Sequence, residues 1–446
     1  MITFDDVSFA YQGGIPDGSE PPALRHIHFH AERGECIVLC GKSGCGKTTM
    51  LRMVNGLVPN FYQGRLEGDI TVGNVHIKEA SLPQVAAVVG SVFQNPRTQF
   101  FHLDTTGEMA FNMENLNIPH DKMVERLKET AWKLDIQTLM DRDIFQLSGG
   151  EKQQIACGSV YASMPEVIVM DEPSSNLDME SIRKLQDLIR TMKDEGKTIL
   201  ISEHRLWYLE DIADRYVLLK DGQIENEFTS DEILALSLQE LEQLGLRAVR
   251  RKQLWNMGTR TIRQEKDMEK AAFLEIEGLR FSRQMRQVLD INRLAIPKGA
   301  IVAVIGENGA GKSTFALCLC GLLKHHGTVR INGERISNKK LPEQAYLVMQ
   351  EPGHQLFSDS VLGELMLNKG TVTETEAVAV LEKMGLAGLE NRHPGSLSGG
   401  QQQRLSLSVA LCTNREIMLY DEPTSGQDGD NLMRTAEMIR EANENA

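Results

Sequence analysis

The sequence predicts an α/β protein with two related domains in tandem, and three observations carry this prediction. The same motifs occur twice in one order, as GKSGCGKTT, LSGGEKQQ and MDEPSSNLD and again as GENGAGKST, LSGGQQQR and YDEPTSGQD. The spacing is constant, because 250 positions separate Ser148 from Ser398 and Asp171 from Asp421. Each glycine-rich motif follows a short apolar run and precedes a helical pattern, which is typical of a strand, a loop and a helix.

The repeat divides the 446 residues into a first domain at 1–229, a charged helical connector at 230–272 and a second domain at 273–446. This agrees with the two or three domains that the length favours. Periodicity predicts the elements around the motifs. Strands are expected at 35–39, 167–170, 198–202, 216–219, 301–305 and 418–420, and helices from Lys47 onward and at 121–134, 182–192 and 432–442.

The second motif set lacks one member of the first. The SEH motif at 202–204 has no counterpart, because the offset of 250 aligns Ala446 with Gly196. We therefore expect the second domain to be C-terminally incomplete, without the strand that corresponds to 198–202. A central strand of a parallel sheet is buried on both faces, so we expect its apolar neighbours to be exposed.

Composition argues against nucleic acid as the main partner. The chain has 48 Lys and Arg against 62 Asp and Glu, a formal net charge of −14, which disfavours general binding of polyanions. The basic stretch from Arg247 to Arg263 is interpreted as a solvated linker face. The N-terminus lacks the features of a signal peptide, and no stretch approaches the ~18 apolar residues of a membrane span. Any membrane role is expected to come through a partner.

The two glycine-rich loops are predicted to bind phosphate groups. Glycines let backbone N–H groups curve around an anion, and the next helix presents its positive N-terminus to the same anion. Lys47 and Lys312 add a full charge, while Thr48 and Ser313 offer a hydroxyl to Mg²⁺. The candidate ATP-binding residues are Gly41, Ser43, Gly44, Cys45, Gly46, Lys47, Thr48 and Thr49, with Gly306, Asn308, Gly309, Ala310, Gly311, Lys312, Ser313 and Thr314.

Paired carboxylates follow an apolar run in each copy. Asp171 and Asp421 end these runs and are candidate Mg²⁺ ligands. Glu172 and Glu422 come next, where a carboxylate can orient or deprotonate the attacking water, an effect of roughly 10²–10⁴ in rate. An isolated Asp-Glu pair would be read as a surface turn, but four apolar residues precede each pair.

Three further polar residues are candidates for the catalytic site. Gln94 and Gln350 each lie between the glycine loop and the LSGG motif, where a Gln can touch Mg²⁺ or the attacking water. His204 follows a predicted buried strand and could contact the γ-phosphate. A single His is more often structural, but its place after the Asp171–Glu172 pair favours a catalytic role.

Together these motifs resemble those of ATP-binding cassette (ABC) ATPases, whose signature is LSGG. The resemblance implies two P-loop ABC ATPase domains, each with a mainly parallel sheet core, an antiparallel β subdomain and a helical subdomain. It also implies that each signature closes on the nucleotide of the other copy, so the two cassettes pair head to tail within one chain. The signature residues are Ser148, Gly149 and Gly150, which would face the Lys312 site, and Ser398, Gly399 and Gly400, which would face the Lys47 site.

Finer matches resemble energy-coupling factor (ECF) transporter ATPases. They are FQNPRTQFF at 93–101, FNMEN at 111–115 and MQEPGHQLFSDSVLGEL at 349–365, the last resembling the second half of fused members. This resemblance implies a membrane-embedded coupling (T) protein and a substrate-binding (S) membrane protein as partners. It places the chain peripherally on the cytoplasmic face of the cell membrane, powering import of vitamins or other micronutrients.

The sequence departs from the family pattern at a few positions. Tyr11 matches the aromatic residue that stacks on adenine, whereas its counterpart in the second copy is Arg283, which can stack through its guanidinium plane. Glu151 stands where Gln is usual in the signature. Cys45 is interpreted as a small residue that a thiol reagent could reach. His26, His28 and His30 alternate on a predicted strand and indicate a polar outer face rather than a metal site.

The leading hypothesis is therefore an ATP-hydrolysing motor subunit of an ECF-type importer. The alternative is a soluble tandem ATPase of the ABC-F type, which acts on ribosomes and also has two cassettes. The FQNPRTQ segment, His204, the acidic charge and the short connector disfavour this alternative. We expect the first site to be complete and the second to be impaired.

Overall fold

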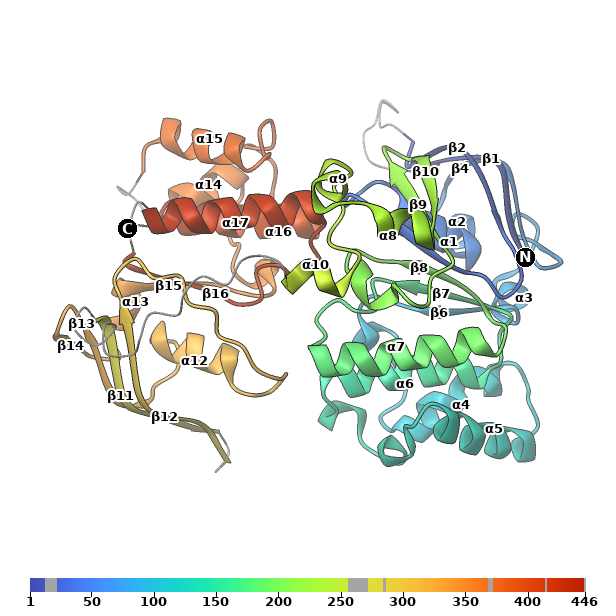
Figure 1. Ribbon diagram of the computed structural model, residues 1–446, viewed down its shortest axis with the longest axis horizontal. Coiled ribbons are helices and arrows are strands. Elements are labelled where there is room, and N and C mark those ends of the chain that lie inside the picture. The colour runs from blue at the N-terminus through green and yellow to red at the C-terminus, as the bar shows by residue number, and fades with distance from the viewer. Residues whose placement is uncertain (13–21, 256–271, 284–285, 368–371, 414, 445–446) are drawn as a thin grey trace. The chain divides into compact units, whose positions relative to one another are not determined.

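The computed structural model describes residues 1–12, 22–255, 272–283, 286–367, 372–413 and 415–444. The chain divides into two compact units, Met1–Met257 with Asp428–Asp430 and Gly258–Gln427 with Asn431–Ala446. Both units combine strands with helices, so the predicted α/β class is confirmed (Figure 1).

A six-stranded sheet forms the centre of the first unit, in the order β10-β9-β3-β8-β7-β6. Its neighbouring strands are parallel except for the antiparallel pair of β9 and β10. All residues of β3 and β8 are buried, as expected for strands covered on both faces. The strands are β3 (Cys36–Gly41), β6 (Val89–Val92), β7 (Val167–Asp171), β8 (Thr198–Ser202), β9 (Arg215–Lys220) and β10 (Gln223–Thr229).

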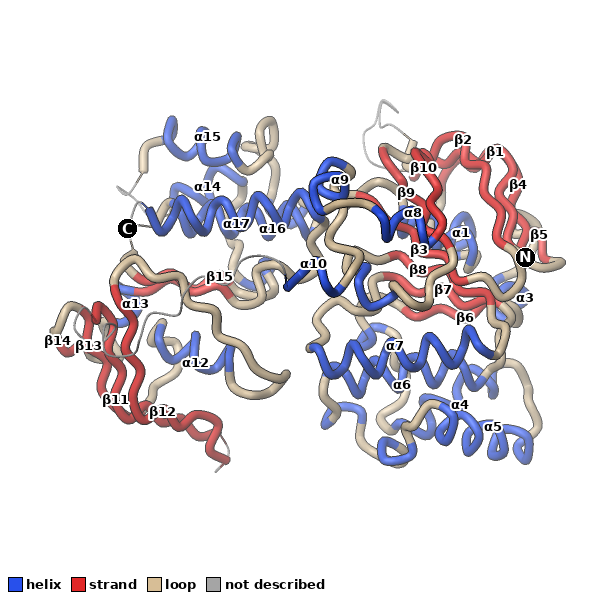
Figure 2. The backbone as a smooth tube through the Cα atoms, viewed as in Figure 1, coloured by secondary structure: helices blue, strands red, loops and turns tan. Residues whose placement is uncertain are grey.

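A second sheet of the first unit is antiparallel and has the order β2-β1-β4-β5 (Figure 2). Along β2 the side chains alternate between buried and exposed, and His26, His28 and His30 are exposed. The predicted polar outer face is therefore confirmed. The strands are β1 (Ile2–Tyr11), β2 (Leu24–Ala31), β4 (Gly64–Val72) and β5 (Val75–His76).

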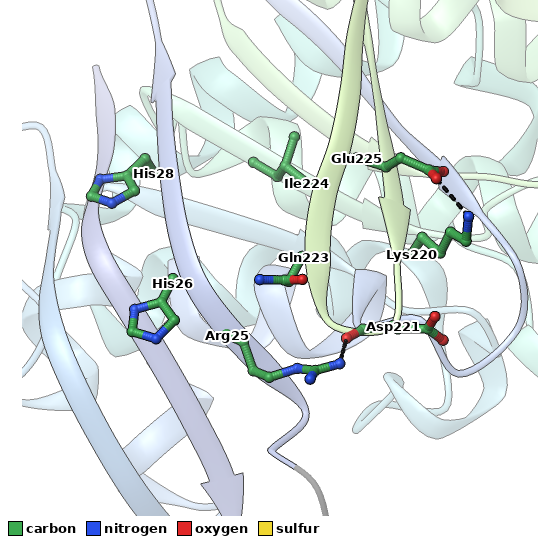
Figure 3. A pocket seen from close by; sticks show the side chains of 8 residues that line it. All are labelled: Arg25, His26, His28, Lys220, Asp221, Gln223, Ile224 and Glu225. Atoms are coloured by element: carbon green, nitrogen blue, oxygen red, sulfur yellow. Dashed lines mark hydrogen bonds and ion pairs between the residues drawn. The ribbon is translucent and has the colours of Figure 1, made fainter.

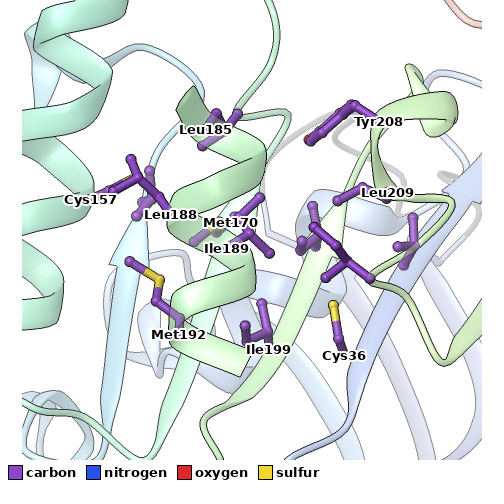
Figure 4. Packing of buried hydrophobic residues seen from close by; sticks show 14 of the residues in the cluster. Cys36, Cys157, Met170, Leu185, Leu188, Ile189, Met192, Ile199, Tyr208 and Leu209 are labelled. Atoms are coloured by element: carbon purple, nitrogen blue, oxygen red, sulfur yellow. The ribbon is translucent and has the colours of Figure 1, made fainter. Parts of the chain in front are cut away.

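Helices surround the six-stranded sheet of the first unit. The apolar spacing of α7 places one face against the sheet, and in Figure 4 its Leu185, Ile189 and Met192 lie close to Met170 and Ile199. The helices are α1 (Lys47–Val54), α2 (Leu57–Asn60), α3 (Leu82–Ala86), α4 (Thr105–Asn115), α5 (His120–Lys133), α6 (Gly149–Ala162), α7 (Met179–Asp194), α8 (Ser230–Ala235), α9 (Leu238–Gln243) and α10 (Arg251–Trp255).

Part of the expected connector packs with the first unit. Ile233 on α8 and Leu241 on α9 are fully buried in the same hydrophobic cluster as Cys36 and Ile199. Arg247 is partly buried, and burial lowers its pKa, so the interpretation of the basic stretch as fully solvated is wrong at this residue. Arg250 and Lys252 are exposed, as expected, and Arg251 is partly buried, while the end of the stretch, at 256–263, lies outside the described residues. The three domain boundaries stay predictions.

The second unit contains a four-stranded antiparallel sheet, in the order β12-β11-β13-β14, and a parallel pair of β15 and β16. The strands are β11 (Ala272–Arg283), β12 (Arg286–Pro297), β13 (His326–Ile331), β14 (Glu334–Ile336), β15 (Ala345–Val348) and β16 (Ile417–Tyr420). The helices are α12 (Lys312–Leu319), α13 (Leu341–Gln344), α14 (Val361–Met366), α15 (Glu374–Lys383), α16 (Gly399–Leu411) and α17 (Gly429–Glu444), the first two residues of α17 being counted with the first unit.

The strand expected at 301–305 does not form, and this prediction is wrong. In the first unit the corresponding β3 lies between β8 and β9. The part of the second unit that the structure describes has no counterpart of either neighbour, so the segment has no hydrogen-bonding strand beside it. Ile301 is 60% and Ile305 89% exposed. This agrees with the expected exposure of apolar residues in this unit.

Candidate nucleotide-binding site

The first glycine loop joins the end of β3 to the start of α1. Gly41 has φ 133°, and a Cβ there would lie 2.2 Å from the carbonyl oxygen of Leu219, so the position requires glycine. Gly46, at φ 110°, precedes the first residue of the helix. The Lys47 ammonium donates to the carbonyl oxygens of Gly41 at 2.9 Å and Lys42 at 3.0 Å. The loop thus curves around the Lys47 ammonium, and α1 begins at the same residue. A positive charge at a helix N-terminus suits the binding of phosphate.

The second glycine loop repeats this geometry. Lys312 donates to the carbonyl oxygens of Gly306 and Glu307, both at 2.8 Å, and Gly311 precedes α12 at φ 100°. The surroundings differ, because Lys47 is only 5% exposed whereas Lys312 is partly exposed. The two loops therefore share a local shape, but the first is held more deeply in its unit.

Oxygen groups suited to a magnesium ion meet beside the first loop. The Thr48 hydroxyl donates to Oδ1 of Asp171 at 3.1 Å. Burial, and next the charge of Glu172, raise the pKa of Asp171, which means that this carboxylate favours a nearby cation. A hydroxyl and a carboxylate are ligands that Mg²⁺ accepts, and so the residues fit the predicted metal.

Glu172 is held by contacts from three segments. Glu172 has a positive φ of 43°, and its backbone N–H donates to the carbonyl oxygen of Ser202 at 2.8 Å. Its carboxylate accepts a hydrogen bond from Gln94 Nε2 at 2.9 Å and lies 3.4 Å from His204 Nε2. Burial alone would raise the pKa of Glu172, but His204 and then Lys47 outweigh burial and lower it. The predicted catalytic residues of the first copy therefore come together around an ionised carboxylate.

The same pair of side chains recurs in the second unit. Gln350 Nε2 donates to Oε2 of Glu422 at 2.9 Å, and Glu422 has φ 48°. Asp421 directly follows β16, and its N–H donates to the carbonyl oxygen of Val348 at 3.0 Å. Ser313 is exposed at the start of α12. The second unit thus reproduces the Gln–Glu contact of the first.

Each LSGG motif begins a helix. Ser148 caps α6 and forms a reciprocal capping box with Glu151, and Ser398 caps α16 in the same way with Gln401. Glu151 and Gln401 do the same local work, which explains why Glu is accepted at this position. Gly149 and Gly399 have open space where a Cβ would lie, and Gly400 approaches only the end of a flexible side chain. A Cβ on Gly150 would lie 2.1 Å from Ser181 Oγ, so this glycine is needed for packing.

Tyr11 ends β1 beside the first glycine loop. Its hydroxyl lies 3.1 Å from Thr49 Oγ1 and accepts a hydrogen bond from Arg52 at 3.4 Å. The Arg52 guanidinium stacks over the ring of Tyr62 at 4.2 Å, and both residues line a cavity of about 70 Å³ that reaches Thr48. Sequence reasoning missed Arg52, although it follows Thr48 by four residues and therefore shares its helical face.

Cys45 does not meet its expectation. The side chain is 5% exposed, and burial raises the pKa of its thiol. A protonated, buried thiol is a poor target for a thiol reagent. The expected access to such a reagent is therefore wrong in this structure.

A larger pocket, of about 580 Å³, lies between β2 and the β9–β10 hairpin (Figure 3). Its basic groups are already engaged, because Arg25 donates to the carbonyl oxygen of Asp221 and Lys220 pairs with Glu225 at 2.6 Å. No residue of the predicted catalytic set lines it. The lining residues are Arg25, His26, His28, Lys220, Asp221, Gln223, Ile224 and Glu225.

Comparison with known proteins assigns the family. The sequence model of the ABC transporter family matches residues 24–175 and 289–425. A putative ABC transporter ATP-binding protein of Treponema denticola is 40% identical over 99% of this chain and 89% of its own length. The putative HMP/thiamine import ATP-binding protein YkoD of Bacillus subtilis is 31% identical over 99% of this chain and 84% of its own. A solved structure, cbiO1 from Clostridium perfringens, part of the ABC transporter complex cbiONQ, is 25% identical with a TM-score of 0.48, covering 57% of this chain and 98% of that one.

The chain belongs to the ABC transporter family, as an ATP-binding protein with two such segments in tandem. It is an ATPase and serves transport. The predicted cassette fold is thereby confirmed. Among the described residues, no helix combines the length and the apolar character that crossing a bilayer requires.

Proposed function

We propose that this chain is the ATP-hydrolysing subunit of an ECF-type importer of vitamins or other micronutrients. The observation that carries the proposal occurs in both units. A Gln, Gln94 or Gln350, donates a hydrogen bond to the Glu that follows a strand, and an exposed apolar loop comes shortly after that Gln in the chain. The sequences around Gln94 and Gln350 supply the ECF resemblance. The YkoD relative, whose name includes HMP/thiamine import, supports a micronutrient as cargo.

In the first site, each side chain has a proposed role. Lys47 and the N–H groups of the glycine loop bind the phosphates of ATP, and Tyr11 stacks on the adenine. The ionised Glu172 carboxylate accepts a proton from the attacking water, while Gln94 and His204 orient that water. Thr48, Asp171 and Gln94 would hold Mg²⁺, which neutralises phosphate charge when bound.

In the second site the corresponding roles fall to Lys312 for the phosphates, Glu422 for the water, and Ser313, Gln350 and Asp421 for the metal. We propose that the cassettes pair head to tail. Each nucleotide would then also meet the signature of the other copy, which comprises Ser148, Gly149 and Gly150 or Ser398, Gly399 and Gly400.

The proposed contact with a membrane-embedded coupling protein begins at Phe101. This side chain is 74% exposed and stacks on Phe111 with ring centroids 4.8 Å apart. The backbone of this loop is held in place, because the buried carboxylate of Glu108 accepts hydrogen bonds from the N–H groups of Phe101 at 2.8 Å and His102 at 2.9 Å. An exposed apolar side chain on a backbone that is held by hydrogen bonds suits contact with a partner protein. Because Phe101 follows Gln94 by a few residues, such a partner would respond to changes at the catalytic site.

The second unit presents the same arrangement. Phe357 is 78% exposed, and the buried Glu364 accepts the backbone N–H groups of Phe357 at 3.0 Å and Ser358 at 2.6 Å. Two such loops in one chain match two coupling helices of a membrane protein. The chain would therefore lie at the cytoplasmic face of the membrane, and a separate substrate-binding membrane protein would select the cargo.

The test is affinity purification of the tagged chain from solubilised membranes and, in parallel, co-sedimentation with ribosomes. We expect a membrane protein to co-purify with the wild type and to be lost when Phe101→Asp and Phe357→Asp are combined. Phe61→Asp is the control, because Phe61 is also exposed, at 69%, but lies elsewhere. Ribosome binding without a membrane partner would overturn the proposal in favour of the ABC-F alternative.

A further inference from the structure

Glu203 is a buried carboxylate between the end of β8 and His204. It is 2% exposed, and its neighbour Tyr208 is fully buried. A buried charge is costly unless hydrogen bonds satisfy it, so its partners indicate its purpose. Glu203 is the middle residue of the SEH motif at 202–204.

The carboxylate of Glu203 binds two separate segments. Oε1 accepts the backbone N–H groups of His204 at 2.8 Å and Arg205 at 3.0 Å. Oε2 accepts the Tyr208 hydroxyl at 2.9 Å and the backbone N–H of Ser174 at 3.3 Å. Burial, and next the charge of Glu203, raise the pKa of Tyr208 well above its ordinary value, which keeps this hydroxyl a donor. All four donors thus converge on one side chain.

Ser174 lies two residues after Glu172, so this cluster reaches the catalytic carboxylate from its C-terminal side. The Arg205 guanidinium adds hydrogen bonds to the carbonyl oxygens of Ser174 and Leu177, both at 3.3 Å. The segment after Glu172 is therefore held through both its N–H and its C=O groups by residues that flank His204. Among the described residues, the side chains of Glu203, Arg205 and Tyr208 have no hydrogen bond to residues 41–46 of the first glycine loop.

We propose that Glu203 is a positioning residue for ATP hydrolysis, whose carboxylate fixes the backbone of His204 relative to the segment after Glu172. This contact sets the 3.4 Å approach of His204 Nε2 to Glu172 Oε1. The inference rests on the proposed roles of Glu172 and His204. It separates nucleotide binding, which uses Lys47 and its loop, from turnover, which needs the His204–Glu172 geometry.

The first test is Glu203→Gln in the full chain. The amide nitrogen replaces one acceptor oxygen and faces donors, so at least one of the four hydrogen bonds is lost. We expect kcat to fall about 10- to 100-fold through misplacement of His204, while the ATP dissociation constant changes less than about 2-fold. An equal loss of ATP affinity would overturn the proposal.

The decisive test is a double-mutant cycle with His204→Ala. If Glu203 acts through His204, Glu203→Gln changes kcat less than about 2-fold once His204 is absent. Losses that multiply in the double variant would overturn this inference and leave the role of His204 intact. Unchanged kcat in His204→Ala alone would overturn both. If Glu203→Gln does not fold, Tyr208→Phe decides in the same cycle, because it removes one donor and keeps the charge.

The variant Ile70→Ala distinguishes a positioning role of Glu203 from a purely structural one. Ile70 is fully buried on β4, in a different hydrophobic cluster from Tyr208. This variant should lower the thermal unfolding midpoint yet leave the kcat of the folded protein unchanged. If Ile70→Ala, at a comparable unfolding midpoint, reproduces the kcat loss of Glu203→Gln, the positioning role is wrong.

Discussion

Gly41 shows how narrowly one residue constrains the first glycine loop. A Cβ at this position would lie 2.2 Å from the Leu219 carbonyl oxygen, whereas a Cβ on the corresponding Gly306 would find its nearest atom, Ala310 Cβ, at 3.5 Å. We expect Gly41→Ala to destabilise its unit by at least about 3 kcal/mol through collision and strain, and Gly306→Ala by about 1 kcal/mol. Thermal unfolding of both variants measures this difference. Equal shifts would contradict it.

The sequence predicted most of the first catalytic site because the motifs name its residues. Gln94, Glu172 and His204 lie far apart in the chain. Gln94 was predicted from its place between the glycine loop and the LSGG motif, and Glu172 and His204 from their places after predicted strands, and the three side chains meet. The role of Glu203 could not be predicted. Its partners depend on how the segment after β8 folds back on Ser174, and no local pattern encodes that packing.

The start of α6 makes a prediction about pH. Burial would raise the pKa of Glu151, but hydrogen bonds from Ser148, and then the charge of Arg142, lower it overall. The stabilisation from the ionised carboxylate is therefore complete above the unfolded pKa of about 4.3 and is lost as pH falls through the lower folded pKa. Glu151→Gln keeps the capping box that Gln401 forms in the second unit.

We therefore expect the wild type to be more stable than Glu151→Gln by about 0.5 kcal/mol near neutral pH, because the charge favours a helix N-terminus. The difference should shrink as pH falls below the unfolded pKa of about 4.3 and disappear once pH is below the lower folded pKa. Unfolding of both proteins in denaturant across this range measures it. A difference that persisted unchanged at lower pH would show that the charge of Glu151 is not its source.

Strand prediction succeeded where partners were present and failed where they were absent. The run at 198–202 forms β8 between β3 and β7, whereas the equally apolar run at 301–305 forms no strand. Apolar residues alone do not make a strand, because its backbone groups need neighbours. Periodicity cannot report whether those neighbours exist.

This contrast predicts two substitutions with unlike effects. Ile37 on β3 is fully buried, while Val302, which also precedes its glycine loop by four residues, is 47% exposed. We expect Ile37→Ala to cost about 2–5 kcal/mol of stability by leaving a cavity, and Val302→Ala to cost less than about 1 kcal/mol. Denaturant unfolding followed by circular dichroism checks this. Comparable losses would mean that the segment at 301–305 is packed in solution.

For the whole molecule, the repeat predicted a two-site ATPase, and the family assignment confirms the ATPase. The cargo could not be read from this chain, because in the proposed transporter a separate membrane protein selects it. The structure adds a difference between the copies. Lys47 is buried, and its glycine loop follows a strand of the six-stranded sheet. Lys312 is partly exposed, and its glycine loop follows a segment that forms no strand. We therefore expect the first site to carry most of the turnover.

Steady-state ATP hydrolysis by the full chain tests this expectation most directly, comparing the wild type with Glu172→Gln and Glu422→Gln. Removing the proposed base from the first site should lower turnover by roughly 10²-fold or more, with ATP binding retained, whereas Glu422→Gln should cost distinctly less. Wild-type turnover in Glu172→Gln would contradict the proposed chemistry of the first site, and equal losses in the two variants would contradict the difference between the sites.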